Sequence, residues 1–221
     1  MASLTREGEI FLLDLGDTEN RFTLAAIAEI QAALDEVAGA EGPRALVTTA
    51  SGKIWSNGLD LDWLLGHPES SRSYVTDVQE IFARLLTLPV PTIAALGGHA
   101  FAAGMMLALC HDFRTMRADR GFLCVPEVDL GIPFTWGMSA LLQSRLAPQV
   151  AHEAMVTGRR YGGGEAAALG MVDHAVAEAR VLELAIELAR PLAAKAGDSM
   201  GTIKERMYAE VVGQLRTLGP T

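Results

Sequence analysis

Short apolar runs that alternate with helix-like segments constrain the fold of this chain most strongly. Residues 9–16, 44–51 and 92–98 are mostly apolar with little polar alternation, which is typical of strands buried on both faces. Between them, residues 22–39 and 73–88 place apolar side chains at helical spacing. Strands joined through helices run parallel, because the helix provides the crossover connection. The sequence therefore predicts an α/β fold.

The remainder of the chain continues this pattern and then becomes helical. Residues 113–117 are a further strand candidate, and two final helices are predicted over 179–196 and 198–216. The length of 221 residues fits one domain with a full core. We expect a core domain over residues 1–195, followed by a short helical segment over residues 196–221.

Composition excludes several function classes. The longest apolar run, residues 100–110, has eleven residues, whereas a membrane helix needs about 20. A net charge of −9 argues against nucleic-acid binding, which depends on clustered basic side chains. Cys110 and Cys124 have no metal-ligand spacing and are expected to be buried thiols. Neither end resembles a signal peptide or a peroxisomal address, so we expect a cytoplasmic protein without membrane contact or metal.

Two glycine-containing loops, each following a predicted strand, are the candidates for chemistry. In "IWSNGLDLDWL" (54–64), Gly58 permits a tight turn in which backbone N–H groups can face outward instead of joining the sheet. In "GHAFAAGMMLAL" (98–109), small residues open a helix, whose first N–H groups have no helical acceptor. Together the loops could form an oxyanion hole, although each alone is also explained as a tight strand–helix turn.

Four segments, in this order, resemble the crotonase family, also called the enoyl-CoA hydratase/isomerase superfamily. They are "WSNGLDL", "PVPTIAALGGHAFAAGMMLALCHD", "FLCVPEVDLGI" and "TGRRYGGGEAAALGMVDHAV". The resemblance runs from about residue 9 to about residue 210. It implies a crotonase-like ββα superhelix and an acyl-CoA substrate, with coenzyme A as the acyl carrier and no tightly bound cofactor. Members of the family are commonly trimers or dimers of trimers, so a homo-oligomer is expected.

The same resemblance assigns roles to individual residues. The amides of Asn57 and Ala103 are the expected oxyanion-hole donors. Catalysis is assigned to the carboxyl group of Glu127 in the "PE" segment. The other expected substrate contacts are Gly58, Leu59, Asp60, Gly104 and Met106 along the acyl-CoA, and Lys53, Arg21 and Phe22 at its nucleotide end.

Met106 decides which branch of the family the chain resembles. Hydratases of the family have a glutamate one turn into the helix after the second loop and another in the "PE" segment, but here the first position is Met106. Hydration needs one group to activate water and another to deliver a proton, whereas moving a double bond needs one proton shuttle. Glu127 alone can do the latter. The pattern thus resembles the Δ3,Δ2-enoyl-CoA isomerase branch, which acts in fatty-acid degradation.

Two alternatives remain open at the level of the sequence. The chain could be an enoyl-CoA hydratase or another crotonase-type acyl-CoA enzyme, because Met106 does not exclude residual hydration. It could also be a homologue that binds acyl-CoA without turning it over, although the retained Glu127 speaks against this.

Overall fold

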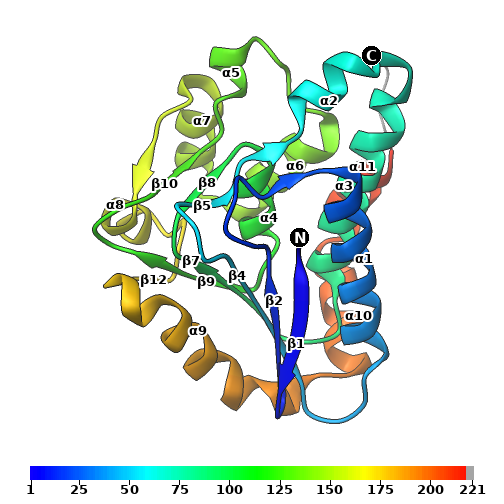
Figure 1. The fold of residues 1–221 in the computed structure, drawn as a ribbon, viewed down its shortest axis with the longest axis vertical. Coiled ribbons are helices and arrows are strands. Elements are labelled where there is room, and N and C mark those ends of the chain that lie inside the picture. The colour runs from blue at the N-terminus through cyan, green and yellow to red at the C-terminus, as the bar shows by residue number, and fades with distance from the viewer. Residues whose placement is uncertain (218–221) are drawn as a thin grey trace.

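A computed structural model describes residues 1–217 as a large and a small sheet, with a third sheet of two short strands, surrounded by helices (Figure 1). The larger sheet has six strands in the order β1-β2-β4-β7-β9-β12. Their bounds are β1 Ser3–Glu7, β2 Ile10–Asp14, β4 Ala45–Thr49, β7 Thr92–Leu96, β9 Phe113–Arg117 and β12 His174–Val176. All neighbouring pairs are parallel except β1 with β2.

A smaller sheet of four strands has the order β11-β10-β8-β5. Its strands are β5 Ile54–Ser56, β8 His99–Phe101, β10 Phe122–Cys124 and β11 Tyr161–Gly162. The first three run parallel, and β11 is antiparallel to β10. Along the chain, β4, β7 and β9 of the large sheet are each followed by a strand of the small sheet and then by a helix. This repetition is the ββα superhelix that the resemblance to the crotonase family implies.

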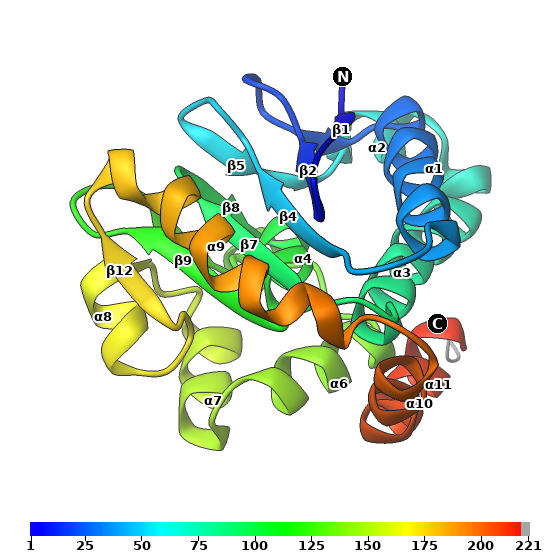
Figure 2. The same ribbon diagram turned by 90° about the horizontal axis from the view of Figure 1, so that it is seen from below.

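Helices close both sides of the large sheet (Figures 1 and 2). Their bounds are α1 Leu24–Gly39, α2 Leu61–Gly66, α3 Ser71–Thr87, α4 Ala103–Leu109, α5 Glu127–Leu130, α6 Trp136–Arg145, α7 Pro148–Thr157, α8 Gly163–Ala168, α9 Val181–Ala189, α10 Asp198–Met207 and α11 Ala209–Arg216. Short 3₁₀ turns cover Pro68–Ser70, Glu178–Arg180 and Arg190–Lys195. Figure 2 shows α9 across one face of the large sheet, where it buries Val47 and Ile93.

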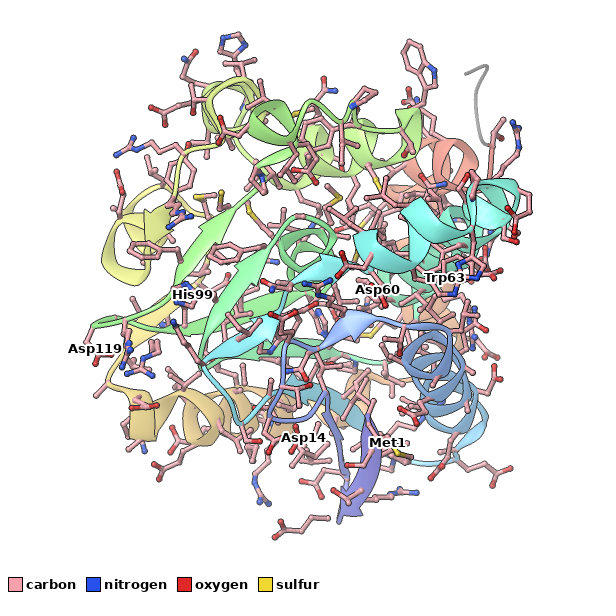
Figure 3. All side chains as sticks on the ribbon, turned by 45° about the horizontal axis from the view of Figure 1, so that its top comes forward. Met1, Asp14, Asp60, Trp63, His99 and Asp119 are labelled. Atoms are coloured by element: carbon pink, nitrogen blue, oxygen red, sulfur yellow. The ribbon has the colours of Figure 1, made fainter. Side chains whose placement is uncertain are left out.

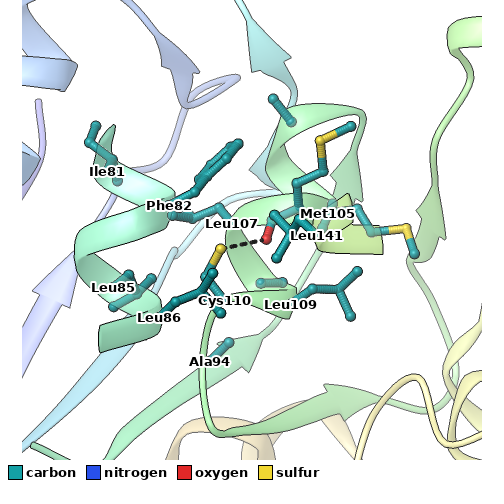
Figure 4. Close-up of a cluster of buried hydrophobic side chains, with 14 of the residues drawn as sticks. Ile81, Phe82, Leu85, Leu86, Ala94, Met105, Leu107, Leu109, Cys110 and Leu141 are labelled. Carbon is teal, nitrogen blue, oxygen red and sulfur yellow. Dashed lines mark hydrogen bonds between the residues drawn. The ribbon is translucent and has the colours of Figure 1, made fainter. Parts of the chain in front are cut away.

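The apolar run of residues 100–110 forms the centre of the main core. Every residue of α4 is buried, and Met105, Leu107 and Leu109 pack among side chains of α3 and α6 (Figure 4). The buried thiol of Cys110 donates to the Met106 carbonyl 3.2 Å away. Within residues 1–217, no helix is long and apolar enough to span a bilayer. The run is therefore a core helix.

The final helices differ in detail from the prediction. The helix expected over 179–196 ends at Ala189 and continues as a 3₁₀ turn, and the one expected over 198–216 breaks at Tyr208 into α10 and α11. β1 is missed because its side chains are mostly exposed and carry no alternating signal.

The helical C-terminal section itself is confirmed, and α11 packs tightly on α6. A Cβ at Gly137 would lie 2.5 Å from the Leu215 Cα, so only glycine permits this approach. The side-chain amide of the buried Gln79 in α3 donates to the Leu215 carbonyl at 3.0 Å. Residues 218–221 of the expected segment lie outside the described residues, and the boundary at residue 195 stays a prediction.

Candidate active site

Three chemistry-bearing segments follow three neighbouring parallel strands of the small sheet. The loop with Gly58 follows β5, α4 begins two residues after β8, and Glu127 comes three residues after β10. Because the carboxyl ends of parallel strands meet at one edge, these segments converge, as they do in the ligand sites of open α/β sheets. The Ala102 amide donates to the Cys124 carbonyl at 2.8 Å, which joins the start of α4 directly to the end of β10.

Gly58 brings the first loop against the start of α4. Its φ of +78° lies in the left-handed region, and a Cβ there would lie 2.8 Å from the Ala103 nitrogen. Gly104 is required for a similar reason, because a Cβ at this position would lie 2.3 Å from the Ser56 carbonyl oxygen. Close packing of α4 on β5 therefore requires glycine at position 104, and the substrate contact expected of Gly104 stays a prediction.

The start of α4 has an unusual backbone. Ala102 adopts φ +50°, a conformation that costs a non-glycine residue free energy, while its carbonyl accepts the first helical hydrogen bond from Met106 at 3.2 Å. Ala103 is the first residue of the helix, so its N–H has no acceptor within the helix. The Ala103 amide is thus free of a helical acceptor, and the role of oxyanion-hole donor that the resemblance implies for it stays a prediction.

The prediction that the Asn57 amide is the second oxyanion-hole donor is wrong. This N–H donates to the Glu19 carbonyl at 3.0 Å and is therefore committed to the backbone of the preceding turn.

The Leu59 amide, two residues further along this loop, points in a different direction. The Gly58 amide donates to the Ser56 hydroxyl at 3.2 Å and the Asp60 amide to the Tyr74 hydroxyl at 2.8 Å. Both hydroxyls in turn donate to carbonyls on the β3 side, where β3 Arg21–Phe22 pairs with β6 Gly58–Leu59. Successive amides in an extended strand point to opposite sides, so the intervening Leu59 amide points away from β3. The sequence could not locate this donor, because its direction depends on the φ angle at Gly58.

Glu127 is the first residue of α5 and carries a buried carboxyl group. The residue is 8% exposed, and its Oε2 atom has no hydrogen-bond partner within residues 1–217. Burial raises the pKa of Glu127 to about 7, against a smaller lowering by its own backbone amide. A carboxyl group with this pKa can both take up and release a proton near neutral pH.

Met106 lies one turn into α4 and is fully buried in the main core. The position where family hydratases have a second glutamate is thus occupied by an apolar thioether. Its predicted role as a wall beside the acyl chain stays a prediction.

At the predicted nucleotide end, Arg21 is already surrounded by carboxylates. Its guanidinium lies 2.6 Å from Glu19, 2.9 Å from Asp62 and 3.6 Å from Asp60. Asp60 also caps α2, because its carboxylate accepts from the Trp63 amide at 3.3 Å. Figure 3 labels Asp60 and Trp63 at the start of α2. The contacts of Arg21 and Asp60 therefore join β3 to the start of α2, and the substrate contacts expected of both residues stay predictions.

The two other residues predicted at the nucleotide end are Phe22, next to Arg21 in β3, and Lys53. The expectation that Phe22 stacks on a nucleotide is wrong, because its ring is 2% exposed and packs edge-on against Phe82 at 5.9 Å. Lys53 is exposed, but it precedes β5, at the opposite end of that strand from Leu59.

Comparisons with known proteins agree with this architecture. A family model described as "Enoyl-CoA hydratase/isomerase" matches residues 6–218. Enoyl-CoA delta isomerase 3 of Arabidopsis thaliana is 40% identical over 96% of this chain and 93% of its own length. Enoyl-CoA delta isomerase 2 of the same plant, named as peroxisomal, is 40% identical over 97% of this chain and 95% of its own length. A solved structure of an enoyl-CoA isomerase from Mycobacterium tuberculosis superposes with a TM-score of 0.87 at 26% identity, over 97% of this chain and 94% of that one.

Proposed function

The chain belongs to the enoyl-CoA hydratase/isomerase family, and two of its relatives are named enoyl-CoA delta isomerases. We propose that it converts 3-enoyl-CoA to 2-trans-enoyl-CoA. The single observation that carries the proposal is the buried Glu127, whose raised pKa suits a group that must carry a proton in both directions. The names of the plant relatives point to the same reaction class.

In the proposed mechanism, the Glu127 carboxylate removes a proton from C2 of the substrate. The C2–H electron pair moves into conjugation with the thioester, and negative charge develops on the thioester oxygen. The amides of Leu59 and Ala103 donate to that oxygen. Removing one such donor typically costs about 3 kcal/mol of transition-state stabilisation. The protonated Glu127 then returns the proton at C4, and the double bond comes to lie between C2 and C3.

The buried Met106 favours isomerisation over hydration. Hydration would need a second group to deliver a proton while the first activates water. At the position one turn into α4, this chain offers a thioether, which can do neither. A single carboxyl group is sufficient for a proton shuttle between C2 and C4.

The experiment follows the ultraviolet absorbance of the conjugated thioester with 3-enoyl-CoA and, separately, the loss of this absorbance with 2-enoyl-CoA. We expect conjugation of the 3-enoyl substrate, little hydration of the 2-enoyl substrate, and loss of conjugation in Glu127→Gln. Asp129→Asn, an exposed carboxylate on the same short helix, is the matched control and should retain activity. Full activity of Glu127→Gln would disprove the shuttle, and efficient hydration would disprove the role of Met106. The expected homo-oligomer, a trimer or a dimer of trimers, and the cytoplasmic location stay predictions.

A further inference from the structure

The outer face of the small sheet carries aromatic rings that are only partly covered. β8 and β10 pair in register, with Ala100 opposite Leu123, and these two side chains are buried in the core. Because side chains alternate along a strand, His99, Phe101 and Phe122 project from the other face. The His99 ring lies 5.0 Å from that of Phe101 and 5.5 Å from that of Phe122. We call this surface the His99 face.

Three cations without ion-pair partners border the His99 face. Lys53 precedes β5, and its carbonyl accepts from the His99 amide at 3.0 Å. The guanidinium of Arg160 lies 5.6 Å from the centre of the Phe101 ring, in a cation–π contact. Arg120 stands two residues before β10. Within residues 1–217, none of the three is within ion-pair distance of a carboxylate.

The positive charge of these side chains acts at His99. Burial lowers the pKa of His99, and four cations lower it further: Lys53, Arg160, Arg120 and Arg117. Arg117 differs from the other three, because Asp119 and Glu178 pair with it at 3.0 Å and 2.6 Å. Arg120 also helps to lower the pKa of Asp119 without pairing with it. Three unpaired cations thus remain together in a chain whose net charge is −9.

His99 also lacks a hydrogen-bond partner for one of its ring nitrogens. The Nδ1 atom of His99 is buried and has no hydrogen bond within the described residues, although buried polar atoms are nearly always bonded. Arginine is well suited to phosphate because its planar fork binds two oxygens at once. We propose that the His99 face binds a diphosphate group, free or as part of a nucleotide, at a site separate from that of the acyl-CoA.

Position in the fold supports the separation. His99 and Lys53 stand at the amino ends of β8 and β5, whereas Ala103 and Leu59 follow the carboxyl ends of the same strands. Figure 3 places His99 near Asp119, on the far side of the molecule from Trp63. The proposal goes beyond the isomerase reaction and does not depend on it.

The test is calorimetric titration of the full chain at low ionic strength with two probes, inorganic diphosphate and adenosine 5′-diphosphate. The variant is Arg120→Gln combined with Arg160→Gln, and the control is Arg190→Gln combined with Arg206→Gln, which removes the same charge from two exposed positions elsewhere on the surface. We expect saturable binding that falls at least about tenfold in the variant and is unchanged in the control, because the variant removes two charge-assisted contacts to phosphate oxygens. Tighter binding of adenosine 5′-diphosphate than of inorganic diphosphate would indicate that the base stacks on the exposed Phe122 ring. Equal binding of the two probes would indicate that the site contacts only the phosphates.

Two further readouts make the result decisive. The imidazole signals of His99 in NMR spectra should shift on addition of diphosphate in the wild type and not in the variant. The KM for 3-enoyl-CoA should be the same in both. The proposal is overturned by absent or non-saturable binding to the wild type, or by an equal loss in the control. It is also overturned if the variant that loses diphosphate binding shows a raised KM for 3-enoyl-CoA, because this face would then be part of the acyl-CoA site.

Discussion

Replacing Glu127 with glutamine should abolish catalysis and at the same time stabilise the protein, in a manner that depends on pH. Burial raises the pKa of this carboxyl group from an ordinary 4.5 to about 7. The folded state therefore holds the proton more tightly than the unfolded chain between these two pH values. By linkage, the free energy of unfolding falls as pH rises through this window. Glutamine has nearly the same shape as the protonated side chain and never ionises.

The magnitude follows from the two pKa values. Each pH unit between 4.5 and about 7 costs about 1.4 kcal/mol, so the ionised Glu127 destabilises the fold by about 3 kcal/mol above pH 7. This is an upper limit, since the residue keeps a small exposed fraction. Near pH 4, where both states are protonated, wild type and Glu127→Gln should differ little.

Urea unfolding of both proteins at several pH values between about 4 and 8 measures this difference. We expect the stability gain of Glu127→Gln to grow across the window and level off above about pH 7. Asp129→Asn, on the exposed side of the same helix, should show no such growth. A gain that is constant with pH, or a glutamine variant that is less stable at pH 8, would refute the argument that burial sets the pKa.

Three other predictions test the site and its support. The kcat/KM of the wild type should rise with pH and reach half its maximum near pH 7, because Glu127 must be ionised to act as a base; a profile flat from about pH 5 to 9 would contradict this. Gly58→Ala should lose more than about tenfold in activity and about 2 kcal/mol in stability, because its φ and its contact with α4 exclude a Cβ. Gly213→Ala is the control, because a Cβ at this position has no atom within 4 Å. Equal losses of activity and stability in the two variants would contradict the prediction. Lys204→Met should lower the free energy of unfolding by about 3 kcal/mol, because it leaves the carboxylate of Asp112, 2.7 Å from the Lys204 ammonium, without its cationic partner; an unchanged denaturation midpoint would disprove this.

The errors at the site share one origin. Asn57 and Phe22 have the right neighbours along the chain, but the sequence does not reveal which way an amide or a ring points. Asn57 donates its N–H backwards to Glu19, and Phe22 turns its ring into the core. Both outcomes depend on how β3 pairs with β6, a contact between segments more than 30 residues apart.

Periodicity by itself determined the α/β class and most strands of the large sheet, because these depend on local spacing, and the resemblance of four ordered motifs to the crotonase family identified Glu127 as the candidate acid–base group. The short strands of the small sheet, the Leu59 donor and the cationic His99 face were decided only by the tertiary structure. Three-residue strands bear no periodicity that a sequence can display. Likewise, the pKa of Glu127 depends on burial by distant segments, and the sequence does not contain the distances that produce it.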